Sequence, residues 1–482
     1  MAEFYVDATQ PLQWGPLPPV GIPRVESAIV RQALRQNELP IRMFLVERDG
    51  RGRLLSPREH RYLVDLLEGH TAALEGDGKK SSWYRLMKTL AAVRAGAYLS
   101  GREFDRAAAA YVLQSDRTGL GFGVAKTLIR GTRLALFGWR DRAGATVDPL
   151  SDPDAHCFLS KLSMHKVAGR RTNAIAASIT ALLHDTIPVD QPEYFEPSHT
   201  EKFKRDLDWM FAHCRQVVCV SESTARRGRA YADAAPTPSA ATIRVNPLGS
   251  FLREGIAEQG DEPLAALAGQ PFAVYCSTIE IRKNHIMLLR VWQKLMPRLG
   301  DRMPTLVLCG RWGWMVDEVR QFLAAHPELG RKVVFLTGIS DPQLAWLYGN
   351  ARFGVFPSHV EGWGLGAAEC LDFGLPVLIS DAEALAEATQ RLMPVIPADD
   401  FDGWCAAVER AATDDAWLAL LRATIAATYR PTSEEAFATR LLTLMQAASG
   451  APAASSAAQS APTGQRGGSG APQGVDFHLK AG

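Results

Sequence analysis

Short apolar runs alternate with stretches of helical periodicity through the second half of the chain. Each run has the length of a buried strand, and its continuous apolar character is typical of a strand covered on both faces. The runs are "FAVYCS" (272–277), "TLVLC" (305–309), "VVFLT" (333–337), "FGVFPS" (353–358) and "PVLIS" (376–380). Strands that alternate with helices at this spacing predict a parallel α/β sheet.

Two of the intervening helices carry start signals. "NHIMLLRVWQKLM" has Asn284 in the position of a capping residue, just before apolar residues at helical spacing. "DPQLAWLYGN" has Asp341 at its start and Pro342 in its first turn, where proline is well tolerated. We therefore expect helices to begin at these two points, with Asn284 and Asp341 as their caps.

The first half of the chain repeats the pattern less regularly. An amphipathic helix is predicted over 21–36, and residues 51–130 are expected to be mostly helical. The predicted strands are "EFYVDA" (3–8), "IRMFLVE" (41–47), "ASITALLHD" (177–185), "QVVCVS" (216–221) and "ATIRVN" (241–246). We predict two doubly wound α/β domains, over residues 1–250 and 251–430, with 51–130 as a helical insertion in the first.

The last part of the chain changes character. "SEEAFATRLLTLMQAA" predicts a helix over about 431–447. From about Ala447 the sequence continues as "AASGAPAASSAAQSAPTGQRGGSGAPQG". Such a composition buries too little apolar surface to offset its chain entropy, so a disordered tail is predicted over 448–482.

Composition excludes several classes of protein. The formal net charge is +1 over 482 residues, which gives no support for a nucleic-acid-binding protein. The seven cysteines are scattered without a C-x-x-C pair, as expected of reduced thiols in a cytoplasmic protein. The N-terminus lacks the pattern of a signal peptide. No apolar stretch reaches the ~18 residues that a membrane-spanning helix needs.

A glycine-rich turn between two acids is the first candidate site. In "EGWGLGAAE", seven residues separate Glu361 from Glu369, and the three glycines let the chain turn from strand 353–358 into a helix that ends near Phe373. The free amides and the dipole of a helix start attract phosphate. One acid would bind the hydroxyls of a ribose, and the other those of a second sugar. The spacing thus fits a nucleotide sugar better than a metal, and two ordinary surface acids remain the alternative.

A basic pair is expected at the same edge of the sheet. Arg282 and Lys283 follow strand 272–277, just before a helix start, and we expect both to be exposed loop residues. Ligands of open α/β sheets bind beyond the carboxyl ends of the strands, so this loop and the Glu361 loop should face one crevice. Arginine and lysine neutralise the charge that develops on a leaving diphosphate. A solvated surface pair is the alternative, against which the position of the pair argues.

Other candidate sites are weaker. Asp152 and Asp154 form a D-x-D array that could bind a divalent metal, but they lie in a proline-rich loop and not at the end of a strand. His184 lies at the end of an apolar strand, which favours a functional role. The alternative is a core histidine with Asp185 as its polar neighbour. The chain has neither a G-x-S-x-G elbow nor a G-x-x-x-x-G-K-[ST] loop, which argues against a serine hydrolase and a P-loop enzyme.

Several motifs together resemble one family. "EGWGLGAAE" resembles the E-x7-E motif of GT-B glycosyltransferases, in particular family 4. "STIEIRKNH" is similar to the "GTIEPRKN" segment of mannosyltransferases of bacterial polysaccharide assembly. "YVDAT…GIPRV", "LLHDTIPVDQPEYF" and "VVCVSESTARRG" resemble further segments of the family. The similarity covers about Phe4 to Ala447, with a poor match over 48–130. The family's PE-x-x-GG segment is represented only by "ALAEATQ", which contains Glu387.

The resemblance implies a GT-B fold and a division of roles. The family transfers a nucleotide-activated sugar with retention, in a cleft between two Rossmann-like domains, and its last helix returns to the N-terminal domain. Carried onto this chain, Glu369 would bind the ribose and Glu361 the donor sugar. Arg282 and Lys283 would stabilise the leaving group, and His184 would lie near the reacting sugar.

The resemblance also implies where the diphosphate lies and which partners the chain has. Amides near Trp363, Gly364 and Leu365 would bind the distal phosphate, and Gly21 would bring the N-terminal loop close to it. The expected donor is a nucleotide sugar, and among nucleotide sugars we expect GDP-mannose. The expected acceptor is a glycan or a lipid-linked glycan, reached from the cytoplasm or from the inner face of the membrane. No metal and no cofactor are expected. A nucleotide-sugar epimerase of the same fold and a non-catalytic glycan-binding protein are the alternatives.

Overall fold

The computed structural model describes most of the chain. The described residues are 2–14, 21–36, 39–47, 49–67, 147–170, 175–235, 239, 241–252 and 267–449. The predicted disordered tail beyond residue 449 lies outside the described residues, as does the helical insertion from residue 68 onwards. The described start of that insertion contains a strand, β3 (Gly52–Leu54), as well as a helix, α3 (Pro57–Leu67), so it is not wholly helical.

The N-terminal half forms a parallel sheet with one antiparallel edge. Within the described residues the strand order is β3-β2-β1-β4-β5-β6-β7, and only β3 runs antiparallel to its neighbour. The other strands are β1 (Glu3–Asp7), β2 (Ile41–Val46), β4 (Ala155–Leu159), β5 (Ser178–Leu183), β6 (Gln216–Cys219) and β7 (Thr242–Val245). The five strands predicted here are present, and β4 is a sixth parallel strand in the middle of the sheet that the sequence pattern did not indicate.

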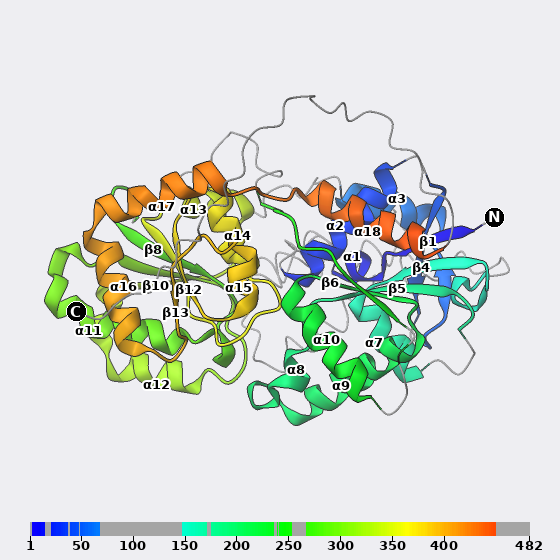
Figure 1. Cartoon of the computed structure of the whole chain (residues 1–482), viewed down its shortest axis with the longest axis horizontal. Helices are drawn as coiled ribbons and strands as arrows, with labels where there is room; N and C mark the ends of the chain where they lie inside the picture. Colours follow the sequence, from blue (N-terminus) through cyan, green and yellow to red (C-terminus); the bar gives the residue numbers. More distant parts are fainter. Residues whose placement is uncertain are drawn as a thin grey trace, which may run out of the picture.

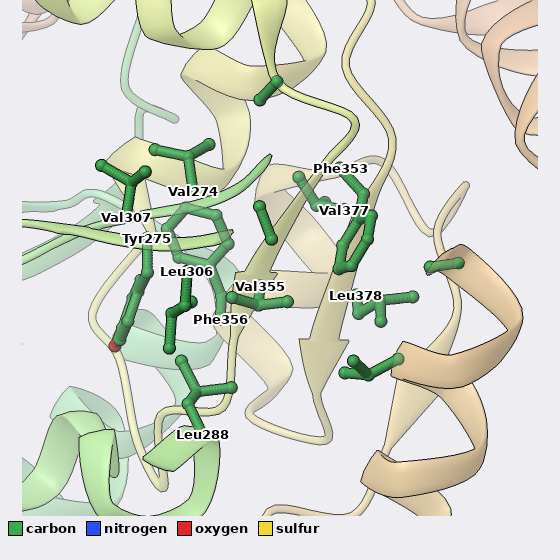
Figure 2. Close-up of a cluster of buried hydrophobic side chains, with 14 of the residues drawn as sticks. Val274, Tyr275, Leu288, Leu306, Val307, Phe353, Val355, Phe356, Val377 and Leu378 are labelled. Atoms are coloured by element: carbon green, nitrogen blue, oxygen red, sulfur yellow. The ribbon is translucent and has the colours of Figure 1, made fainter. Parts of the chain in front are cut away.

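The C-terminal half forms a second, fully parallel sheet. Its order is β10-β9-β8-β11-β12-β13 within the described residues. The strands are β8 (Phe272–Cys276), β9 (Thr305–Cys309), β10 (Val333–Leu336), β11 (Phe353–Phe356), β12 (Val377–Ser380) and β13 (Val395–Ile396). Figure 2 shows side chains of neighbouring strands, among them Val274, Leu306 and Val355, packed together with Leu288 from a covering helix. The five predicted strands are therefore confirmed, and the short β13 is added to them.

Helices cover both sheets, and Figure 1 shows the two α/β units side by side. Those of the first half are α1 (Thr9–Trp14), α2 (Ile22–Arg35), α7 (Lys161–Arg170), α8 (Ile187–Asp190), α9 (Pro197–His213) and α10 (Glu222–Ala234). Those of the second half are α11 (His285–Leu299), α12 (Asp317–Ala325), α13 (Asp341–Asn350), α14 (Leu365–Asp372), α15 (Glu383–Ala388), α16 (Phe401–Thr413), α17 (Asp415–Thr428) and α18 (Glu434–Ala448). No helix of the described residues combines the length and the apolar character that a bilayer crossing needs.

Neither of the two predicted capping residues caps its helix with its side chain. Asn284 precedes α11 in a left-handed conformation, but its side-chain amide donates to the carbonyls of Pro357 and Ala398 and not to the helix. The cap of α13 is Ser340, whose hydroxyl accepts from the Gln343 amide in a reciprocal pair. The Asp341 side chain, the first of α13, is thereby left available for another contact.

Helix α18 belongs to the core of the N-terminal half, although it is the last element of the described chain. It lies along α2, as Figure 1 shows. Phe437 is fully buried in the same apolar cluster as Val25 and Ile29 of α2. The Asn246 amide donates to the Phe437 carbonyl at 3.0 Å, and Arg31 forms an ion pair with Glu434. The chain thus returns to its first half to complete that half's core.

Two chain crossings between the halves run side by side. The Ser250 amide donates to the Thr432 carbonyl at 2.5 Å. A side chain at Gly249 is excluded, because a Cβ there would lie 2.4 Å from the Ser433 carbonyl oxygen. The segment that leaves the N-terminal sheet and the segment that returns to it are therefore in direct contact.

The burial of Phe437 allows a test of the packing of α18 against the N-terminal half. Phe437→Ala should lower the free energy of unfolding by about 3–5 kcal/mol, because it empties a buried aromatic position. Leu420→Ala on α17 is the matched control, since Leu420 is 56% exposed and a surface truncation usually has little effect. Urea unfolding of both variants measures the difference. An unchanged midpoint for Phe437→Ala would contradict the core role of α18.

Candidate active site

The carboxyl ends of the two sheets meet at the glycine turn after β11. The Ser221 hydroxyl, at the end of β6, donates to the Gly362 carbonyl at 2.8 Å, and the Thr224 hydroxyl donates to it at 3.2 Å. A Cβ on Gly362 would lie 2.1 Å from the His184 carbonyl oxygen at the end of β5. Glycine is required at this position because the backbones of the two sheets approach so closely.

Glu361 lies just before this turn in a buried cluster of charges. Lys283 forms an ion pair with Glu361 Oε1, and Arg282 Nη1 lies 3.2 Å from Oε2. The Ser358 hydroxyl donates to Oε1 at 2.8 Å. Burial alone would raise the pKa of Glu361, but Lys283 and Arg282 outweigh it and lower this pKa to about 2. Glu361 is therefore ionised at neutral pH.

The basic pair is more enclosed than its sequence predicts. We expected Arg282 and Lys283 to be exposed loop residues, but their side chains are only 18% and 13% exposed. They lie in a short 3-10 helix, η3 (Ile281–Lys283). Arg282 also contacts Glu280 at 2.7 Å and donates to the Val360 carbonyl at 3.0 Å. The buried carboxylates on either side hold the two cations against the protein.

Glu369 lies on the other side of the turn, on α14. Its side chain is 5% exposed, and Arg24 Nη1 of α2 lies 3.5 Å from its Oε1. The Tyr348 hydroxyl donates to Oε2 at 3.3 Å. Burial raises the pKa of Glu369 to about 7, although Arg24 acts in the opposite direction. The two glutamates of the motif thus differ in their charge at neutral pH, because Glu361 has two close cations and Glu369 has one more distant cation.

The predicted phosphate-binding amides lie at the start of α14. Gly364 is the N-terminal residue before the helix, with φ 104°, and no side chain caps it. Trp363 and Leu365, on either side, pack against the apolar core of the N-terminal half. Gly21 has φ 57° at the start of α2 and leads directly into the turn that carries Arg24. The predicted donor-binding residues of both halves therefore gather at the junction of the two sheets.

His184 is a neutral side chain at this junction. It is buried, and among the described residues its Nε2 has no hydrogen-bond partner. Burial, helped by Lys161, lowers the pKa of His184 to about 3. The imidazole is therefore uncharged at neutral pH, and its Nε2 is a buried polar atom.

Carboxylates of α15 contact the start of α10 across the junction. Glu387 accepts from the backbone amides of Glu222 and Ser223 at 2.7 and 2.8 Å. Glu383 accepts from the Ser223 hydroxyl at 3.1 Å. Sequence reasoning had noted Glu387 only as a poor match to a family segment, and it had quoted Arg24 without giving it a role. No local pattern reveals either contact, because each partner lies far away in the sequence.

The D-x-D pair lies away from this junction. Asp152 and Asp154 precede β4, and the Asp154 carbonyl accepts from Glu3 at the amino end of β1. The site residues lie at the opposite, carboxyl edge of the same sheet. Across the described ranges, no group of three or more His, Cys, Asp or Glu side chains is arranged to hold a metal ion.

Sequence comparison relates the C-terminal half to a known family. Residues 258–414 match the family model described as "Glycosyl transferases group 1". This stretch resembles a group 1 glycosyltransferase domain. It contains every predicted site residue of the C-terminal sheet, including both motif glutamates and the basic pair.

The curated relatives are mannosyltransferases. The chain is 31% identical over 256 residues to the serotype-specific mannosyltransferase WbdA of Escherichia coli, a match that covers 50% of this chain and 30% of that protein. It is 34% identical over 151 residues to O-antigen chain mannosyltransferase B of Escherichia coli, which covers 31% of this chain and 39% of that protein. The chain thus spans about a third of the length of the curated relatives it matches.

Solved structures support the GT-B fold. Sucrose-phosphate synthase from Thermosynechococcus elongatus aligns with a TM-score of 0.55 at 17% identity, over 93% of this chain and 99% of that chain. A UDP-forming trehalose-phosphate synthase from Burkholderia xenovorans aligns with a TM-score of 0.50 at 15% identity, over 70% of this chain and 80% of that chain. The chain therefore has the GT-B fold that its motifs predict.

The buried state of Lys283 generates a prediction for stability as well as for activity. Lys283→Met should lower the free energy of unfolding by about 1–3 kcal/mol, because Glu361 then loses its closest ionic partner in a buried place. Turnover should fall by ~100-fold or more, as on loss of a preorganised electrostatic group. Urea unfolding and initial rates measure the two effects.

Two further variants control this test. Lys294→Met removes a lysine from the exposed face of α11 and should change neither quantity. The double variant Lys283→Met/Glu361→Gln should be more stable than Lys283→Met alone, since no unpaired carboxylate remains, yet it should stay inactive. A wild-type unfolding midpoint for Lys283→Met would show that the ion pair does not hold the site together.

Proposed function

We propose that the chain transfers a sugar from a nucleotide-sugar donor to a glycan or lipid-linked glycan acceptor in polysaccharide biosynthesis. The observation that carries this proposal is the buried cluster of Glu361, Lys283 and Arg282 at the carboxyl edge of one sheet, next to a turn whose Gly362 approaches the His184 backbone of the other sheet. The names of the relatives favour mannose as the sugar and GDP-mannose as the donor. A lipid-linked acceptor would bring the protein to the inner face of the membrane.

The cluster suits recognition of a sugar beside a diphosphate. Glu361 is an ionised acceptor that can receive the hydroxyls of the donor sugar. Lys283 and Arg282 have donors left after pairing with Glu361, and these can bind the diphosphate oxygens. In a site shielded from water, such fixed charges stabilise the negative charge that develops on the leaving group. The start of α14 adds backbone amides on the same side.

The proposed reaction proceeds with retention and without a metal. The bond between the sugar and the diphosphate breaks, and the acceptor hydroxyl forms the new bond on the same face of the sugar. The proton of that hydroxyl passes to the departing phosphate oxygen. Arg282, Lys283 and the α14 amides balance the charge of the leaving group, and the neutral His184 orients the reacting sugar by a hydrogen bond. The work of the protein is positioning and electrostatics.

A binding screen tests the proposal directly. GDP-mannose should raise the melting temperature of the purified chain, because a ligand that binds only the native state adds to its stability, by ~2.7 kcal/mol at a hundred times its Kd. UDP-glucose, dTDP-glucose and ADP-glucose should raise it less. Transfer of labelled mannose to a polysaccharide or lipid-linked acceptor is the functional readout. The proposal is wrong if none of the nucleotide sugars changes the melting temperature.

Alanine variants of the two motif glutamates, Glu361 and Glu369, should differ in their effects on ligand affinity. Glu369→Ala should weaken binding of GDP and of GDP-mannose alike, by about ten- to a hundredfold, because both ligands contain the ribose. Glu361→Ala should leave GDP affinity nearly unchanged, since it frees Lys283 and Arg282 for the phosphates, while it lowers affinity for GDP-mannose and the rate of transfer. Isothermal titration with both ligands measures this. Equal loss of GDP in the two variants would refute the division of roles.

A further inference from the structure

Arg24 is a buried cation that reaches from one half of the protein into the site of the other. It lies in the first turn of α2, in the N-terminal half, and its side chain is 9% exposed. Its Nη2 forms an ion pair with Asp341 at the start of α13, and its Nη1 lies 3.5 Å from Glu369 Oε1 on α14. A single guanidinium therefore joins carboxylates of two helices of the C-terminal half.

The charges around Glu369 explain why its contact with Arg24 matters. The titratable groups that face Glu369 are Arg24 from α2, Asp341 and Tyr348 from α13, Cys276 from β8, Asp372 and Cys370 from its own helix, and Tyr429 just after α17. In this set, within the described residues, Arg24 is the one cation, and Asp341 and Asp372 repel a negative charge on Glu369. The ionised form of this buried carboxyl therefore depends on Arg24.

We propose that Arg24 is a positioning residue that makes ribose binding by Glu369 depend on contact between the two halves. The inference rests on the proposed function, because it assumes that Glu369 binds the ribose. An ionised carboxylate accepts both ribose hydroxyls, whereas a protonated carboxyl must use one oxygen as a donor. Arg24 favours the ionised form by its charge and by its approach to Oε1.

The geometry of the arginine side chain suits this task. A guanidinium presents donors in a fixed planar arrangement, so the pair with Asp341 also fixes the direction in which Nη1 points at Glu369. A lysine at this position supplies one point charge and cannot contact both carboxylates in the same way. The shape of Arg24 and not only its charge is therefore expected to matter.

The contact also couples nucleotide affinity to movement of the two halves. Arg24 moves with α2, whereas Glu369 and Asp341 move with the C-terminal sheet. When the halves separate, Glu369 loses its cation and becomes easier to protonate, so its hold on the ribose weakens. When the halves close, the affinity returns. Closure around the donor and release of the nucleoside diphosphate after transfer would thereby both depend on the contact between Arg24 and Glu369.

The experiment measures binding of GDP-mannose by isothermal titration between pH 6 and 8.5, where the diphosphate of this diester carries no titrating proton. In the wild type, affinity should fall as the pH drops through about 7, because a proton then competes for Glu369. Arg24→Gln should weaken binding by about tenfold or more at pH 7.5. It should also move the fall in affinity to higher pH, since loss of the cation raises the pKa of Glu369 further.

Two variants separate this role from a structural one. Arg31→Gln is the matched control, because Arg31 lies on the same helix but pairs with Glu434 of α18 and not with a carboxylate of the site. It should lower the melting temperature without changing the affinity or its pH profile. Arg24→Lys should bind with an intermediate affinity, and it replaces Arg24→Gln if the latter fails to fold.

The outcomes distinguish the inference from the function on which it rests. Wild-type affinity and pH profile in Arg24→Gln, with binding lost in Glu369→Ala, would overturn the role of Arg24 alone. Tighter binding in Arg24→Gln would also overturn it, because Arg24 would then compete with the ribose. Undiminished binding in Glu369→Ala would refute the ribose role of Glu369 that the inference assumes, whereas no binding by the wild type would refute the proposed function.

Discussion

Burial of the Glu361 carboxylate is the constraint on which the rest of the site depends. A carboxylate without water must be paired, and the protein meets this demand with Lys283 and Arg282 from a short helix that follows a different strand. The free energy needed to remove these charges from water is supplied by folding, before any ligand binds. Such preorganisation is what gives an electrostatic site its effect on a leaving group.

Several polar contacts join the two sheets at this junction. Gly362 accepts hydroxyl hydrogen bonds from Ser221 and Thr224, and Glu387 caps the start of α10 with its carboxylate. Polar contacts of this kind can exchange with water when two halves move apart, whereas a continuous apolar interface could not open without exposing its surface. The junction is therefore closed in this structure by contacts that are reversible in solution.

The sequence predicted much of the fold because parallel strands buried on both faces are continuous apolar runs. It failed at β4, where an acidic loop precedes only five residues and His156 interrupts the apolar pattern, and at the very short β3 and β13. The rule that strand ends share one edge brought Arg282 and Glu361 together correctly. It could not reveal Arg24 beside Glu369, nor the burial of Lys283, because those depend on how two separate sheets meet.

The return of α18 to the first half has a consequence for the order of folding. The C-terminal sheet and its helices come from one continuous stretch of chain, so they can assemble as soon as that stretch is synthesised. The N-terminal core cannot, because Phe437 and its neighbours emerge last and fill a space beside α2. During translation the first half must wait, with apolar surface uncovered, until the final helix arrives. The core of the N-terminal half is thus completed only after the C-terminal sheet has been synthesised.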